Sequence, residues 1–269
     1  MYPKTILITG ITSGIGKAFI KRAEHDFPNC TIVALSLHKP KQKLPSNVEL
    51  YKVDITNHSK IDHIMKKILK VHSSIDILIN NAGNGWRGMV EDTTIEEAKQ
   101  QMEVNVWAAM RLTQWVLPGM RDNKRGHIVN ISSMATTIDY ATIGYYSATK
   151  AFIEKISKVM AKEVAPWDIN VSLIAPGAIK TKFGHNMINI KQYGKGPYKQ
   201  SYQDWANKFE LMFNFPVSSD RVADRIITVI KHPKSYIYIT FRDTFYGYLK
   251  RILSTHIFDK FIQDKYMKL

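Results

Sequence analysis

The sequence predicts an α/β fold, with one doubly wound, mostly parallel sheet of seven strands and helices on both faces. Short runs rich in β-branched residues alternate with segments of helical periodicity. Several of these runs are apolar throughout, as in parallel strands that are buried on both faces. The chain has 269 residues, 45% of them hydrophobic, which suits one domain over residues 1–269.

Seven runs are expected to form the strands of this sheet. In chain order they are Thr5–Thr9, Thr31–Ser36, Val48–Val53, Ile75–Ile79, His127–Ile131, Asn170–Ala175 and Tyr236–Thr240. Because helical segments separate them, right-handed βαβ crossovers should place the strands parallel in one sheet.

The segments between the strands carry helix signals. Thr94 to Glu97 has the pattern of a capping box at a helix start. Ser218 or Ser219 is expected to cap another helix, which Pro233 follows. Two helices are recognised by apolar residues three and four positions apart: Ile61, Ile64, Met65, Ile68 and Leu69 in one, and Val222, Ile226, Val229 and Ile230 in the other.

The composition limits the classes of protein to which this chain can belong. The single cysteine, Cys30, excludes an intrachain disulfide and suits a reducing compartment. No secretory signal is visible, and no apolar run reaches the roughly 18 residues that span a bilayer. We therefore expect a cytoplasmic protein that at most lies on a membrane surface. The net charge of +15 favours anionic ligands. No nucleic-acid-binding module is recognisable, so no nucleic acid partner is expected, and no residue is assigned to a metal.

A glycine-rich motif, Thr9-Gly10-Ile11-Thr12-Ser13-Gly14-Ile15-Gly16, follows the first strand and opens a helix. A bound phosphate needs backbone N–H groups at a helix N-terminus, and a β-carbon there would block its approach. The motif is therefore assigned to cofactor binding through Gly10, Thr12, Ser13, Gly14, Ile15 and Gly16. A glycine-rich turn without a ligand is the alternative.

Two further motifs end the third and fourth strands. Asp54, followed by Ile55, could accept a hydrogen bond from an adenine amino group, or it could cap the helix before Ile61. Asn80-Asn81-Ala82-Gly83 ends the fourth strand, where the crevice of such sheets opens. Asn81, Ala82 and Gly83 suit backbone contact with a ribose, and an ordinary turn is the alternative.

Tyr146-Ser147-Ala148-Thr149-Lys150 is the strongest chemical signal in the chain. Residues four apart share one helix face, so the phenol and the ammonium should project together. A neighbouring cation favours the phenolate, so Lys150 should lower the pKa of Tyr146 from its ordinary value of about 10. Ser133 ends the fifth strand and could bind a substrate oxygen opposite the tyrosine.

Taken in order, these motifs resemble the short-chain dehydrogenase/reductase family, in its shorter, single-domain branch with a Rossmann-type sheet. Asn105 in Glu103-Val104-Asn105-Val106 and the segment Pro176-Gly177-Ala178-Ile179-Lys180-Thr181 also match in position. The resemblance covers residues 3 to 183 closely and the strand near 236–240 loosely. It implies an enzyme that interconverts a carbonyl and an alcohol with NAD(P) as its cofactor.

The resemblance also assigns roles to the matching residues. Tyr146 would be the catalytic acid, Lys150 would bind the nicotinamide ribose and Ser133 would hold the substrate oxygen. Asn105 would hold a water in a proton relay. Tyr145 also lies near Lys150, but the family pattern selects Tyr146. Residues matching the nicotinamide side of the cofactor site are Pro176, Gly177, Ile179 and Thr181.

The end of the second strand bears on the choice of cofactor. An acid there would bind the 2′-hydroxyl of NAD, but Ser36 and Leu37 are followed by His38 and Lys39. Lys39 or Lys41 could meet the 2′-phosphate of NADP. One residue argues against NADP, because Leu37 occupies the position where NADP-using relatives often carry arginine. We assign Ser36 and Lys39 to the cofactor site and favour NADP, with NAD still possible.

Two segments lie outside the motifs. Residues 182–216 form the longest irregular stretch, and its many aromatic residues suggest a lid over an apolar substrate; the alternatives are a core of the loop itself or an oligomer contact. Residues 241–269 form an amphipathic extension whose apolar residues fall largely on one helical face. Packing on the protein or on a second subunit is favoured, and peripheral contact with an anionic membrane is the alternative.

Two other functions remain to be weighed. A non-catalytic dinucleotide-binding protein on the same fold would be expected to lack Tyr146, Lys150 or Ser133, and all are present. An epimerase or dehydratase of the longer branch would carry a T-G-x-x-G-x-x-G loop, which this chain lacks. The partners expected are a small carbonyl or alcohol substrate and, by resemblance, further copies of the chain in a homodimer or homotetramer.

Overall fold

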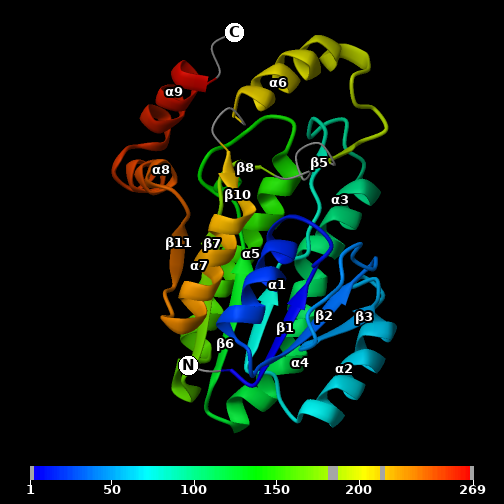
Figure 1. Cartoon of the computed structure of the whole chain (residues 1–269). Coiled ribbons are helices and arrows are strands. Elements are labelled where there is room, and N and C mark those ends of the chain that lie inside the picture. Colours follow the sequence, from blue (N-terminus) through cyan, green and yellow to red (C-terminus); the bar gives the residue numbers. More distant parts are fainter. Residues whose placement is uncertain (1–2, 181–186, 213–215, 267–269) are drawn as a thin grey trace.

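A computed structural model describes residues 3–180, 187–212 and 216–266. Its main sheet has seven strands in the order β11-β7-β6-β4-β1-β2-β3, and every pair of neighbours is parallel. The predicted doubly wound sheet is confirmed (Figure 1). The bounds of these strands are β1 Thr5–Thr9, β2 Thr31–Ser36, β3 Val48–Lys52, β4 Ile77–Asn80, β6 Gly126–Ile131, β7 Ile169–Ala175 and β11 Tyr236–Tyr238.

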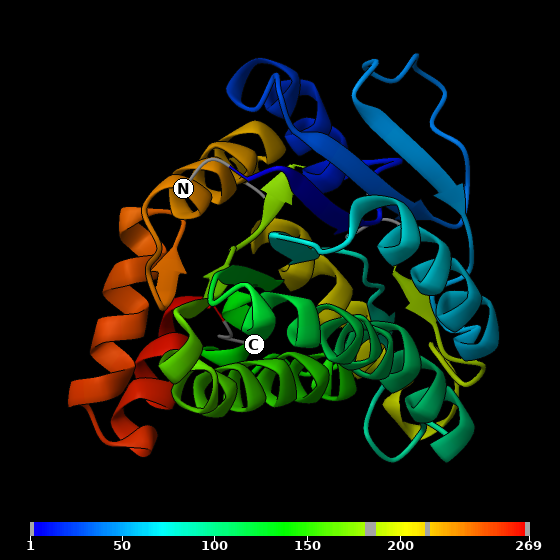
Figure 2. The same ribbon diagram turned by 90° about the horizontal axis from the view of Figure 1, so that it is seen from below.

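Helices cover both faces of the sheet (Figure 2). One face packs against α1 and α7, and the other against α2, α4 and α5. The helices run over α1 Gly14–Asp26, α2 His58–His72, α3 Ile95–Met102, α4 Ala108–Asp122, α5 Gly144–Glu163, α6 Lys199–Met212, α7 Ser219–Lys231, α8 Phe241–Ile252 and α9 Thr255–Tyr266. Thr94 caps α3 in a capping box and Ser218 caps α7, as predicted.

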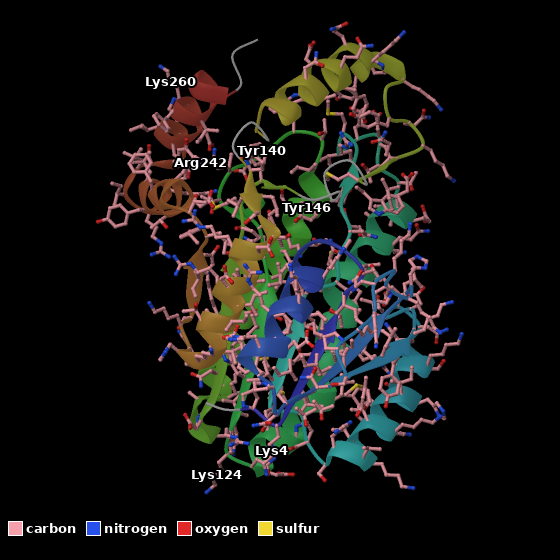
Figure 3. The ribbon with its side chains drawn as sticks, in the orientation of Figure 1. Lys4, Lys124, Tyr140, Tyr146, Arg242 and Lys260 are labelled. Atoms are coloured by element: carbon pink, nitrogen blue, oxygen red, sulfur yellow. The ribbon has the colours of Figure 1, made fainter. Side chains whose placement is uncertain are left out.

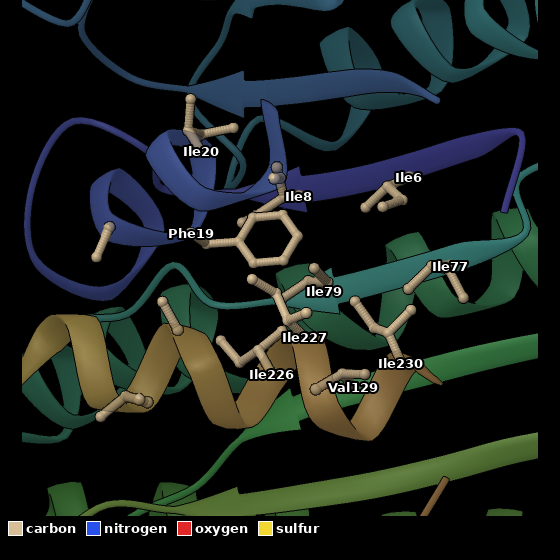
Figure 4. Packing of buried hydrophobic residues seen from close by; sticks show 14 of the residues in the cluster. Ile6, Ile8, Phe19, Ile20, Ile77, Ile79, Val129, Ile226, Ile227 and Ile230 are labelled. Atoms are coloured by element: carbon tan, nitrogen blue, oxygen red, sulfur yellow. The ribbon is translucent and has the colours of Figure 1, made fainter. Parts of the chain in front are cut away.

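Two apolar layers form the core because successive side chains of a buried strand point to opposite faces. Ile6 and Ile8 of β1 face α1 and α7, whereas Leu7 between them faces α2 and α4. Figure 4 shows the first layer, where the Phe19 ring from α1 meets isoleucines of β1, β4 and α7. This packing fixes the carboxyl ends of the strands, where the predicted motifs lie.

Residues 182–216 are not the irregular stretch that the sequence suggested. Within its described part lie β9 Ile188–Asn189, which pairs with β5 Trp86–Arg87, and helix α6. Further on, β10 Val217–Ser218 pairs with β8 Ile179–Lys180. Tyr202 of α6 is buried, and its hydroxyl donates to Asp92 Oδ2 at 2.8 Å and accepts from the Met89 N–H at 2.8 Å. At least part of the aromatic content therefore serves packing of the segment itself. Phe183, Phe213 and Phe215 lie outside the described residues.

The C-terminal extension forms two helices, α8 and α9, and its apolar residues divide between two faces. Tyr246, Phe258 and Ile262 are buried in a cluster with Met134 and Ile138, the segment that follows β6. The prediction that the extension packs on the protein is confirmed for this face. The prediction of a single apolar face is wrong, because α8 itself has two: Tyr246 is buried in this cluster, whereas Phe245 and Tyr248 are 45% and 64% exposed. In the described residues no helix is long and apolar enough to cross a membrane.

Removing the Phe19 ring should weaken the core sharply. We expect Phe19→Ala to lower the free energy of unfolding by about 3–5 kcal/mol, because the residue has no exposed surface and leaves a cavity. Phe245→Ala, at a phenylalanine that is 45% exposed, should cost about 1 kcal/mol or less and serves as the control. Urea unfolding monitored by circular dichroism measures both, and equal losses would contradict the packing described here.

Candidate functional site

The candidate site lies at the carboxyl ends of the parallel strands, the end of the molecule where Tyr146 lies in Figure 3. The glycine loop follows β1, the Asn-Asn-Ala-Gly turn follows β4 and Ser133 follows β6. Helix α5 brings Tyr146 and Lys150 to the same edge. In open α/β sheets ligands bind outside the carboxyl ends of the strands, so this placement agrees with the sequence prediction.

The glycine loop has the geometry that its glycines permit. Gly10 and Gly14 have φ values of +75° and +52°, a region that side chains disfavour. A β-carbon on Gly16 would lie 2.2 Å from the Gly10 carbonyl oxygen, and one on Gly10 would lie 2.9 Å from Ala82 Cα. Glycine is therefore required at Gly10 and Gly16 for close packing of the loop itself.

The turn after β4 holds the glycine loop in place. Asn81 Nδ2 donates to the carbonyl oxygens of Thr9 and Gly10, both at 2.9 Å. In return, the Thr9 hydroxyl accepts from the backbone N–H groups of Asn81 and Ala82 at 3.1 and 2.9 Å. The Asn81 side chain and the N–H groups of Asn81 and Ala82 thus support the loop, so a ribose contact through these two residues would fall to their backbone carbonyls.

The first turn of α1 is suited to an anionic group. Ser13 precedes the helix in an extended conformation and its side chain makes no capping hydrogen bond. The first turn also contains no acidic residue. The N–H groups and the positive end of the helix dipole can therefore act on a bound phosphate. Thr12, Ser13, Gly14 and Ile15 are exposed or half-buried here, which fits the dinucleotide pyrophosphate.

Tyr146 and Ser133 meet inside the site. Tyr146 is buried on the first turn of α5, and its phenol hydrogen-bonds with the Ser133 hydroxyl. Ser133 Oγ accepts from the Ala135 N–H at 3.1 Å, which fixes the serine at the start of the short helix Met134–Thr136. Since that oxygen accepts from the backbone, its own proton is available to the phenol oxygen. Ser133 therefore lies beside the phenol, and its predicted bond to a substrate oxygen stays a prediction.

Lys150 lies one helical turn after Tyr146 and is also buried. Its Nζ donates to the Ile131 carbonyl oxygen at 2.9 Å and lies 5.9 Å from the centre of the Tyr146 ring. Burial lowers the pKa of the Lys150 ammonium to about 8. Burial also raises the pKa of the Tyr146 phenol to about 12, and the Ser133 hydrogen bond acts against that rise. The predicted lowering of the Tyr146 pKa is therefore wrong in net direction, because removal from water penalises both charged forms.

Asn105 lies in a π-helical turn, η1 Glu103–Trp107, between α3 and α4. Its amide is fully engaged within the site. Oδ1 accepts from the Asn84 N–H at 2.9 Å, and Nδ2 donates to the Asn84 carbonyl at 2.9 Å and to Thr149 Oγ1 at 3.1 Å. These bonds tie η1 to the turn after β4 and to α5. Single π-helical turns within α-helices occur frequently at functional sites.

Gly83, in the turn after β4, lies close to both Asn105 and Lys150. A β-carbon there would lie 3.1 Å from Asn105 Oδ1 and 3.6 Å from Lys150 Nζ. A small pocket opens between the strand ends, and its lining includes Thr9, Ile55, Asn80, Ala82, Asn105, Ile131 and Lys150. The structure therefore brings together Asn105, Lys150, the turn after β4 and Ile55.

The segment after β2, which was predicted to lie on the adenosine side of a cofactor, is exposed beyond Ser36. Ser36 at the end of β2 is buried, whereas Leu37, His38 and Lys39 are exposed. Asp54 Oδ1 accepts from the backbone N–H and the hydroxyl of Thr56, at 2.9 and 2.7 Å. Asp54 does not cap α2, because Asn57 takes that position and accepts from the Lys60 N–H. The capping alternative for Asp54 is therefore wrong, and the adenine contact stays a prediction.

The segment after β7, which was predicted to contact the nicotinamide, lies against the Ser133 loop. The Pro176 carbonyl accepts from the Met134 N–H at 2.9 Å, which joins this segment to the Ser133 loop. The buried Asp243 carboxylate of α8 accepts from the Gly177 N–H, and a β-carbon on Gly177 would lie 2.7 Å from Asp243 Oδ1. Ile179 is half-buried at the start of β8. Thr181 lies outside the described residues.

Glu154 was not identified from the sequence. It is buried one turn beyond Lys150, and its Oε1 accepts from Ser132 Oγ, Thr136 Oγ1 and the Tyr236 hydroxyl at 2.7, 2.7 and 2.6 Å. These bonds hold the residues on either side of Ser133 against α5. Tyr146, Lys150 and Glu154 are spaced four apart on one helix face, and this regular spacing was the signal in the sequence that could have identified Glu154.

A sequence profile described as short chain dehydrogenase matches residues 4–191. The chain belongs to the short-chain dehydrogenase family. A solved short-chain dehydrogenase from Streptomyces avermitilis superposes with a TM-score of 0.80 at 28% identity, covering 93% of each chain. The fold and the order of motifs therefore agree with the resemblance found in the sequence.

Two relatives carry informative names. The 3-ketodihydrosphingosine reductase of Bacteroides thetaiotaomicron is 37% identical over 209 residues, 78% of this chain and 74% of the relative. The NADPH-dependent 3-dehydrocapnine reductase of Ornithobacterium rhinotracheale is 32% identical over 207 residues, 72% of this chain and 71% of the relative. This short-chain dehydrogenase is an NAD(P)-dependent oxidoreductase that interconverts a carbonyl and an alcohol. The alternative of a non-catalytic binding protein receives no support.

Burial of Lys150 should cost the protein stability. Since its pKa of about 8 in the folded chain is below the ordinary 10.5, the cost is full below about pH 8 and fades as the pH rises towards 10.5. We expect Lys150→Met to raise the free energy of unfolding at pH 7 by on the order of 1–2 kcal/mol, after subtraction of the lost Ile131 hydrogen bond. Thermal unfolding of both proteins at neutral pH and at about pH 9.5 measures the gain and its decline. A variant less stable than the parent at pH 7 would contradict the argument.

Proposed function

We propose that this enzyme reduces a ketone on a long-chain, lipid-like substrate, with NADPH as the hydride donor. The observation that carries the proposal is the group formed by the half-buried Ser133 and the buried Tyr146 and Lys150, next to an apolar wall. The names of the two relatives support a ketone as the reacting group.

In this proposal Tyr146 is the general acid. With a pKa raised to about 12, the phenol is protonated at neutral pH and can donate its proton to the carbonyl oxygen. The Ser133 hydroxyl, which is already bonded to the phenol, also binds the substrate carbonyl oxygen and holds it within reach of the phenol. Bound NADPH supplies the hydride that the carbonyl carbon receives. Lys150, charged below a pH of about 8, stabilises the resulting phenolate and binds the nicotinamide ribose.

Asn105 is proposed to position a water that returns a proton towards Lys150. Its side chain is held by Asn84 and Thr149, so it cannot turn away from the site. In the π-helical turn the Ala108 N–H bonds the Glu103 carbonyl, five residues earlier. Because the Asn105 side chain is already bonded, the water in this proposal binds a backbone carbonyl of the π-helical turn.

The surroundings of Tyr146 favour an apolar substrate. Tyr146 packs in a buried cluster with Ala135, Ile143 and Met187, and Tyr140 lies against the same cluster. Sites that bind apolar ligands have this character, with a few polar groups for orientation. A ketone carried on a long alkyl chain would place its oxygen between Ser133 and Tyr146 and its chain along this wall. Residues 182–216 are proposed as the lid of this site.

NADPH is proposed over NADH because the chain lacks an acid after β2. No Asp or Glu occurs between Ser36 and Val48, and Lys39, Lys41 and Lys43 in that stretch are exposed. An exposed lysine in this loop can pair with a 2′-phosphate, whereas no carboxylate is present to bind a 2′-hydroxyl. The Ornithobacterium relative is named as NADPH-dependent, which supports the same choice.

A homo-oligomer in the cytoplasm completes the proposal. Trp107 of η1 is 43% exposed and packs edge-on against Phe152 of α5 at 5.4 Å between ring centres, which supports an interface through these helices. The single cysteine, Cys30, is buried, and burial raises the pKa of its thiol to about 12. A lone unreactive thiol suits a reducing compartment.

Replacing the phenol tests the catalytic assignment. Tyr146→Phe removes the proton donor and should lower kcat by on the order of a hundred- to ten-thousand-fold on any ketone that the parent enzyme reduces. The affinity for NADPH should change little, because the glycine loop is untouched. NADPH oxidation against long-chain ketones measures turnover, and nucleotide fluorescence measures binding. Tyr145→Phe is the matched control and should keep its activity. Full activity in Tyr146→Phe would contradict the assignment.

The choice of cofactor is tested by titration. We expect NADPH to bind roughly 10-fold or more tightly than NADH, and Lys39→Glu to weaken NADPH binding while leaving NADH nearly unchanged. Lys60→Glu, at an exposed lysine on α2, is the control for a general change of charge. Calorimetry with both nucleotides gives the affinities, and equal affinities in the parent enzyme would overturn the preference.

A further inference from the structure

A second apolar face of the C-terminal helices is exposed. Phe245, Tyr248 and Ile252 of α8 are 45%, 64% and 61% exposed, and their spacing of three and four residues puts them on one side of the helix. Ile257 on the first turn of α9 is 54% exposed. We name these four residues the outer face. Exposed clusters of large apolar side chains typically mark interaction sites.

The outer face is not needed to hold the two helices on the protein. Their opposite side already does so, with Tyr246, Phe258 and Ile262 buried against Met134 and Ile138. Lys250 adds a hydrogen bond from Nζ to the Thr137 carbonyl at 2.6 Å. The helices are thus packed without the outer face, which is left for another partner.

Basic side chains lie beside the outer face. Arg251 and Lys260 are exposed and Arg242 is half-buried. Among the acids of these helices whose side chains the structure describes, Asp243 is buried at the start of α8 and Asp259 is half-buried; the Asp264 side chain on α9 is outside the described part. An apolar face bordered by arginine and lysine is complementary to an anionic lipid surface, where apolar groups enter the headgroup region and cations meet phosphate.

The outer face belongs to the catalytic end of the molecule. In Figure 3 the labelled Arg242 and Lys260 lie at the same end as Tyr140 and Tyr146, whereas Lys4 and Lys124 lie at the opposite end. The cluster beneath the two helices includes Met134, which directly follows Ser133. A surface that binds α8 and α9 would therefore lie at the same end of the molecule as Ser133 and Tyr146.

A second copy of the chain fits this face less well. An isologous contact between two outer faces would bring Arg251 and Lys260 of each copy towards the same residues of the other. Such like charges repel when they are brought together and desolvated. The net charge of +15 adds to this repulsion and favours an anionic partner.

We propose that the outer face docks this enzyme on the surface of an anionic phospholipid membrane. Phe245, Tyr248, Ile252 and Ile257 enter the headgroup region, and Arg251 and Lys260 pair with lipid phosphates. The site then faces the layer in which a long-chain ketone resides. The docking is a proposal beyond the proposed reaction. Because vesicle binding is measured without turnover, either proposal can fail while the other stands.

Co-sedimentation of the full chain with vesicles tests the proposal. We expect binding to phosphatidylcholine vesicles containing about 30% phosphatidylglycerol, much weaker binding to phosphatidylcholine alone, and a decline with added salt. Tyr248→Ser/Ile252→Ser should lower the partition coefficient roughly 10-fold or more. The matched control is Val71→Ser/Ile95→Ser, which removes two side chains of similar exposure, 69% and 58%, on other helices.

A second pair of variants tests the charges. Arg251→Gln/Lys260→Gln should weaken binding to the anionic vesicles several-fold, and Lys4→Gln/Lys124→Gln, at the opposite end, should change it little. The proposal is overturned if the intact chain stays in the supernatant with anionic vesicles at low salt. Equal losses in a test pair and its control pair also overturn it. If Tyr248→Ser/Ile252→Ser forms a smaller oligomer in size-exclusion chromatography, a second copy covers the outer face, and the proposal is likewise overturned.

Discussion

The hydrogen bond from Lys150 Nζ to the Ile131 carbonyl is the interaction on which the site depends. It fastens α5 to the end of β6 and keeps an ammonium group where water is largely excluded. On the same helix, Tyr146 is thereby held against Ser133, and Glu154 holds the residues that flank that serine. One helix face thus carries the proton donor, the cation and the anchor of the loop opposite. The cost of burying the cation is offset elsewhere, by the two apolar layers on the sheet.

Most of the sheet and the sequence motifs could be predicted because their signals are local. Seven β-branched runs and the glycine spacing near Gly10 need no knowledge of distant contacts. The pKa of Tyr146 could not be predicted from its spacing to Lys150, because burial depends on packing around α5 and not on i, i+4 geometry. Asp54 and Asn57 both suit a helix cap, and only the path of the chain after β3 decides between them.

The remaining differences between the predicted and the observed structure lie in segments whose conformation depends on tertiary contacts. Helix α6 has a weak apolar pattern, and Tyr202 is held by Asp92 and Met89, more than a hundred residues away in sequence. In the same way, the two faces of α8 and α9 could not be distinguished without the residues after β6 that cover one of them. Glu154 gains its importance from Tyr236 on a distant strand. Such contacts have no counterpart in sequence periodicity.

The isolation of Cys30 has a practical consequence for chemical labelling. Alkylating reagents attack the thiolate, and a buried thiol with a pKa of about 12 offers almost none near neutrality. A cysteine introduced on the solvent side of any helix would then be the one thiol that a maleimide dye reaches. A fluorophore can therefore be attached at a chosen position without first removing the native cysteine. The enzyme's own sequence makes it suitable for site-specific spectroscopy.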